Sequence, residues 1–128
     1  MITKYIDVGD NKWGVIVCYD YNLLDFDDMW AIMRSFGLSG AKADDSLRIL
    51  SELNTGMAIS NDDLRMSVIF IGDAVNESEW WSTLNHELLH VGNAIINYYD
   101  EDFDGEPAAY LQGYLMKSVV EKVAYPCY

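Results

Sequence analysis

Apolar and polar residues alternate along four short stretches of the chain, which is the pattern of half-buried β-strands. The first two stretches are residues 2–8 and 12–20, and Gly9, Asp10 and Asn11 between them supply the turn of a hairpin. The other two are residues 57–60 and 64–72, on either side of Asn61-Asp62-Asp63. The alternation therefore predicts two pairs of strands.

A period of three to four residues replaces this alternation elsewhere and predicts four helices. Their approximate ranges are residues 27–36, 44–53, 78–97 and 106–123. We expect Asp25 or Asp27 to cap the first helix, and Asn76 or Ser78 to cap the third. The order ββααββαα predicts a single α+β domain over residues 1–128, with a small antiparallel or mixed sheet.

The composition of the chain limits the cellular locations and protein classes that fit this domain. The chain has 128 residues, of which 51% are hydrophobic, so it can bury a core. No apolar run approaches the roughly 20 residues that a membrane span needs. The first residues lack the apolar segment of a signal peptide, and two cysteines, Cys18 and Cys127, form no disulfide framework. These features predict a cytoplasmic protein without a membrane partner.

The formal net charge of −13 is the strongest compositional signal. It argues against binding nucleic acid, because such proteins contact phosphates through Lys and Arg. It is compatible with a solvated acidic surface, with cationic partners or metal ions, and with a protein that imitates the charge of DNA. Charge alone does not choose among these.

The segment His86-Glu87-Leu88-Leu89-His90 carries the clearest chemistry, an H-E-x-x-H motif that uses both histidines of the chain. On a helix, residues four apart share a face, so His86 and His90 can bind one Zn²⁺. Glu87 lies between them and is suited to act as general base on a metal-bound water. Leu84, Leu88, Val91 and Ile95 form an apolar stripe that is expected to bury the helix and leave the motif beside a cleft.

A catalytic zinc usually has three protein ligands, so a third must come from elsewhere. No third histidine exists, and the downstream carboxylates are Asp100, Glu101, Asp102, Asp104 and Glu106. We choose Glu106, because a ligand at a helix start is held more rigidly than one on a loop. Ala109 is expected to let the last helix pack closely against the motif helix. Tyr110 would then orient a ligand or stabilise an oxyanion, although packing in a core explains it equally well.

The acidic segment of residues 100–105 permits a different interpretation. It matches the D-x-D-x-D-G opening of a calcium loop. The match then fails, because position twelve should be a bidentate Glu and is Leu111, and Pro107 occupies position eight. A solvated acidic turn between two helices is the plainer interpretation.

The strand predicted at residues 66–71 leads directly into the motif helix. Metallopeptidases commonly present the edge of such a strand above the metal, where an extended peptide can pair with it. The sequence does not show whether this edge is free.

Two segments together resemble a known group of enzymes. They are Thr83-Leu84-Asn85-His86-Glu87-Leu88-Leu89-His90 and Glu106-Pro107-Ala108-Ala109-Tyr110, which are similar to the H-E-x-x-H…E-x-x-A pattern of small gluzincin-type peptidases. The chain is most similar to the ImmA/IrrE family of metallopeptidases and to short phage-type relatives. The resemblance covers about residues 66–120 and implies a minimal zincin-like fold, His86, His90 and Glu106 as zinc ligands, and Glu87 as general base. The family usually has Gly in place of Leu89 and Asn in place of Tyr110.

These observations favour a zinc-dependent peptidase acting on a peptide or protein. Two alternatives remain open at this stage. One is a non-catalytic, peptidase-like acidic module that binds proteins or inhibits by imitating DNA. The other is metal-assisted hydrolysis of an amide that is not a peptide.

Overall fold

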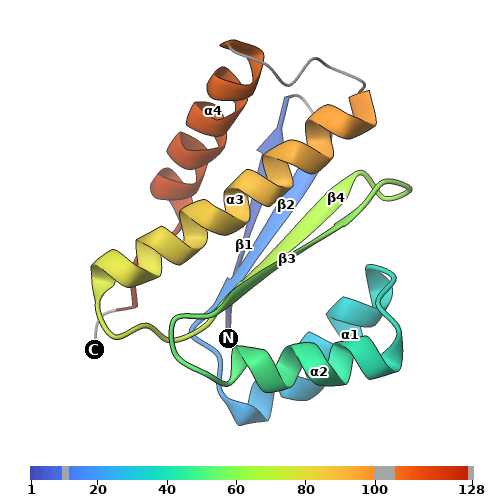
Figure 1. Ribbon diagram of the computed structural model, residues 1–128, viewed down its shortest axis with the longest axis vertical. Helices are drawn as coiled ribbons and strands as arrows, with labels where there is room; N and C mark the ends of the chain where they lie inside the picture. Colours follow the sequence, from blue (N-terminus) through green and yellow to red (C-terminus); the bar gives the residue numbers. More distant parts are fainter. Residues whose placement is uncertain (10–11, 100–105, 127–128) are drawn as a thin grey trace.

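The computed structural model describes residues 1–9, 12–99 and 106–126, and for Glu106 and Pro107 it describes the backbone alone (Figure 1). The predicted order ββααββαα and the α+β class are confirmed. The elements are β1 (Ile2–Val8), β2 (Trp13–Tyr19), the short 3-10 helix η1 (Leu23–Asp25), α1 (Phe26–Ser35), α2 (Gly40–Leu50), β3 (Gly56–Asn61), β4 (Met66–Ile71), α3 (Glu77–Tyr99) and α4 (Glu106–Lys122).

The four strands form one mixed sheet in the order β1-β2-β4-β3. The pairs β1/β2 and β3/β4 are antiparallel, and the central pair β2/β4 is parallel. The expectation that residues 66–71 offer an edge to substrate is therefore wrong, because β4 is paired on both sides. The nearly continuous apolar run of β4 is typical of a strand that is buried on both faces of a sheet. The edge next to the motif helix is β3.

The buried core has two parts, one on each face of the sheet, because successive side chains of a strand point to opposite faces. On β2, Trp13, Val15 and Val17 point to the face covered by α3 and α4, whereas Cys18 points to the face covered by α1 and α2 (Figure 1). The sheet is thus the middle of three layers. This arrangement explains why β2 is buried along almost its whole length.

Side-chain caps mark the starts of α2 and α3, whereas Asp25 precedes α1 without a side-chain capping hydrogen bond. Asn76 is the cap of α3, since its Oδ1 accepts a hydrogen bond from the backbone N–H of Glu79 at 2.9 Å. The expected start of α2 at residue 44 is wrong. That helix begins at Gly40, because the Ser39 hydroxyl caps it by accepting from the N–H of Lys42 at 3.2 Å.

The apolar stripe of α3 is buried as predicted and fixes the motif helix on the sheet. Helix α3 lies against β3 and β4, and α4 lies against α3 and β1, so α4 is on the side of α3 away from β3 (Figure 1). The two helices approach each other at Gly92, where an added Cβ would lie 3.4 Å from Gln112 Oε1. Ala109 is exposed, so it does not make the close contact expected of it.

Within the described part of the chain, none of the helices combines the length and the apolar character required to traverse a lipid bilayer.

Candidate metal centre

The two histidines of the motif converge on one point at the surface of α3. Both side chains are exposed, and their Nε2 atoms lie 3.3 Å apart although their ring centroids are 4.9 Å apart. Two nitrogen ligands at about 2.0–2.1 Å from a tetrahedral zinc are about 3.3–3.4 Å from each other. The same distance suits a hydrogen bond between two neutral imidazoles. The pair therefore has the separation that a shared zinc ion requires.

Glu87 points in a different direction from the histidines, toward the start of β3. Its side chain is buried, with a relative exposure of 7%. The contact is possible because β3 begins with glycine. A Cβ built on Gly56 would lie 3.1 Å from Glu87 Cγ and 2.6 Å from Thr83 Cγ2. The absence of a side chain at Gly56 thus lets α3 approach the strand closely enough to hold Glu87 there.

Burial changes the proton affinity of this carboxyl. Desolvation raises the pKa of Glu87 above its usual range, and the neighbouring His90 and His86 oppose that rise. A carboxylate with a raised pKa accepts a proton more readily at neutral pH than a solvated one. This environment is the one expected of a general base.

A cleft of about 370 Å³ opens beside this pair of elements. Its walls come from α3, the last turn of α2, the segment that joins α2 to β3, and the first residue of β3. The lining residues are Ile49, Asn54, Thr55, Gly56, Ser82, Thr83, His86 and Glu87. One metal-ligand candidate and the candidate base therefore face the same cleft, which borders the free edge of β3.

Of the remaining candidates predicted from the sequence, the structure describes the side chain of Tyr110 alone. Tyr110 lies on α4 and is 74% exposed. The side chain of Glu106 and the acidic residues 100–104 lie outside the described residues, so the third ligand stays a prediction, as does the calcium loop. Among the described residues, no group of three His, Cys, Asp or Glu side chains is arranged to hold a metal ion.

Sequence reasoning missed the role of Gly56. A glycine at the first position of a strand is, however, a signal of close backbone approach. Thr83 was likewise overlooked, although it lies on α3 one turn before Glu87 and shares the contact.

A scan against models of protein families gave no match to this chain, and neither did searches of curated proteins and of solved structures.

Proposed function

We propose that this protein is a zinc-dependent peptidase of minimal size, built around His86, His90 and Glu87. The observation that carries the proposal is the 3.3 Å separation of the two Nε2 atoms, with a buried carboxyl on the adjoining face of the same helix. Two histidines at tetrahedral spacing and a general base are the core of an H-E-x-x-H hydrolase.

The residues present fit zinc chemistry. His86 and His90 would hold the ion as neutral imidazoles through Nε2, and Glu106 is proposed as the third ligand. When bound, zinc supplies Lewis acidity toward a water molecule and a peptide carbonyl. Glu87 takes the proton of the attacking water on its carboxylate and delivers it to the nitrogen of the leaving amine.

The free edge of β3 supports a peptide as the substrate. An extended segment can pair with the open N–H and C=O groups of this strand while its carbonyl lies near the histidines. Side chains of an added strand alternate between the two faces. On the α2 face, Ile49, Leu50 and Met57 border a hollow of about 100 Å³, which offers room for one aliphatic side chain.

The test is hydrolysis by the zinc-loaded protein. A mixture of synthetic peptides, including some with an aliphatic residue at each position, is incubated with wild type and with Glu87→Gln, and products are read by mass spectrometry. We expect cleavage by wild type only, because the amide keeps the size of Glu87 and cannot accept the proton. Equal cleavage by both proteins would remove Glu87 from the mechanism.

One observation favours the alternative of a non-catalytic acidic binding module. The formal net charge of −13 suits a module that binds a cationic partner or imitates the charge of DNA. In that case neither wild type nor Glu87→Gln cleaves any peptide, whether or not the protein takes up zinc.

A further inference from the structure

Three loops meet at the end of the sheet where β2 and β4 finish and β3 begins. Tyr19 of β2 and Gly56 of β3 both pair with Ile71 of β4, which places these strand ends side by side. The loops are residues 20–25, 51–55 and 72–76, and we call their shared surface the loop end. Asn54 and Thr55 of the loop end also line the cleft of His86 and Glu87, but the two hollows described below share no lining residue with that cleft.

The loop end carries the most exposed aliphatic side chains of the molecule. Among large aliphatic residues in the described part of the chain, the four highest exposures are those of Leu24 at 91%, Leu23 at 75%, Val75 at 61% and Leu53 at 59%. Single exposed leucines are ordinary on protein surfaces. Here Leu23 and Leu53, from two different loops, line one hollow, and Leu24 and Val75 lie in the same set of loops. Such a gathering of exposed apolar side chains, which we call the patch, is of the kind that marks an interaction site.

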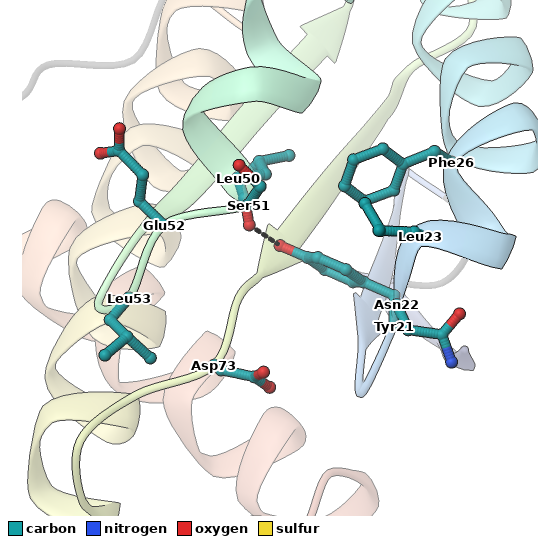
Figure 2. Close-up of a pocket in the computed structure, with 9 residues that line it drawn as sticks. All are labelled: Tyr21, Asn22, Leu23, Phe26, Leu50, Ser51, Glu52, Leu53 and Asp73. Carbon is teal, nitrogen blue, oxygen red and sulfur yellow. Dashed lines mark hydrogen bonds between the residues drawn. The ribbon is translucent and has the colours of Figure 1, made fainter.

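Two hollows lie within this patch. The first has a volume of about 200 Å³, and Figure 2 shows Leu23 and Phe26 on one side of it, Glu52 and Leu53 on the other, and Asp73 below. Tyr21 extends across it and donates a hydrogen bond to the carbonyl of Leu50 at 3.5 Å.

The second hollow, of about 370 Å³, is bordered by aromatic side chains. Trp80 and Tyr125 line it, and their ring centroids are 5.7 Å apart. Leu53 and Asp73 line both hollows. The two hollows are therefore neighbours, with Leu53 and Asp73 between them.

The charge around the patch has one sign. The loops contain Asp20, Asp25, Glu52 and Asp73, and no Lys or Arg. The N-terminal ammonium nearby is paired with Asp25 at 3.3 Å, and Arg48 is paired with Asp45. The carboxyl end of α2, including the Leu50 carbonyl, adds partial negative charge to the first hollow.

We propose that the loop end binds a basic, amphipathic segment of another protein. An apolar side chain of that segment enters the hollow beside Leu53, and its Lys or Arg side chains face Asp73 and Glu52. A second copy of this chain does not fit, because a net charge of −13 on each partner opposes association. Nucleic acid is opposed for the same reason.

The probe is a synthetic amphipathic peptide of fourteen residues made only of Leu and Lys, and its control replaces every Leu with Ser. Titration calorimetry and ¹⁵N NMR follow binding to the wild-type protein. We expect the Leu/Lys peptide to bind, to shift the amides of residues 20–25, 51–55 and 72–76, and to bind more weakly as salt is raised. The Ser/Lys peptide should bind at least about tenfold more weakly, because apolar burial is lost.

Variants locate the contact. Leu53→Ser should weaken binding by about tenfold, the loss expected for part of a leucine's burial. The matched control is Leu64→Ser in the β3–β4 turn, where the Leu64 side chain is 49% exposed. This variant should bind the peptide with an affinity within about twofold of wild type, because it removes a similar apolar area outside the loop end. Asp73→Asn should weaken binding and flatten the salt dependence. The proposal is overturned by absence of binding to wild type, by shifts spread over all acidic surfaces, or by equal losses in Leu53→Ser and Leu64→Ser.

Discussion

Replacing Gly56 with alanine tests whether close approach of β3 holds the candidate base. The added Cβ would lie 2.6 Å from Thr83 Cγ2, 3.1 Å from Glu87 Cγ and 3.3 Å from the carbonyl oxygen of Phe70. Thr83 is β-branched and lies on a helix, so its rotamer does not adjust freely. Overpacking of this kind costs about 1–3 kcal/mol. For a domain of this size the expected fall in melting temperature is on the order of 3–12 °C.

Thermal and urea unfolding measure this loss, and two further variants make the measurement specific. Gly113→Ala is the matched control, because nothing lies within 4 Å of a Cβ at that helical position. It should leave stability unchanged or raise it by up to about 1 kcal/mol, since alanine favours helix over glycine. Thr83→Ser removes the nearest clashing methyl and should recover part of the loss in the double variant Gly56→Ala/Thr83→Ser. Equal stability of Gly56→Ala and wild type, or no recovery in the double variant, would refute the reasoning.

Three further predictions concern the charges of the candidate centre. Burial raises the pKa of Glu87, so the ionised form of this side chain destabilises the folded protein. Glu87→Gln should therefore raise the urea midpoint of the zinc-free protein at neutral pH. The gain in midpoint should vanish as the pH falls below the usual range of a glutamate pKa. A gain that persists in acid would contradict this cause. Zinc affinity measured by calorimetry should be lower in acid than at neutral pH, because protons compete with zinc for the nitrogens of His86 and His90; a flat profile would point to other ligands. Glu106→Ala should weaken zinc more than alanine at any acidic residue of 100–104, and a dominant aspartate there would instead remove Glu106 from the ligand set.

Local patterns of the sequence predicted the elements well where packing and capping are local. The stripe that includes Leu84 and Leu88 identified the buried face of α3, and Asn76 identified its first turn. The pattern failed at the start of α2, because the hydroxyl of Ser39 caps this helix ahead of the start predicted at residue 44.

The sequence did not predict which segments that are distant along the chain lie together in the fold. The strand order depends on which strands pair across the sheet, and the apolar run of β4 has the same appearance at an edge as in the interior. The motif predicted that His86 and His90 share a face, and their Nε2 separation agrees. It did not predict that Glu87 is buried, because that burial depends on Gly56, a residue thirty-one positions earlier in the chain.

The most direct test of the metal centre is zinc stoichiometry by native mass spectrometry, with wild type beside His86→Ala. The Nε2 pair at 3.3 Å predicts one zinc per wild-type chain and none retained by the variant under the same conditions. The variant should remain folded, because the apolar stripe of α3 is buried without help from the histidines. A wild-type protein that takes up no zinc, or a His86→Ala variant that keeps a full equivalent, would contradict the account.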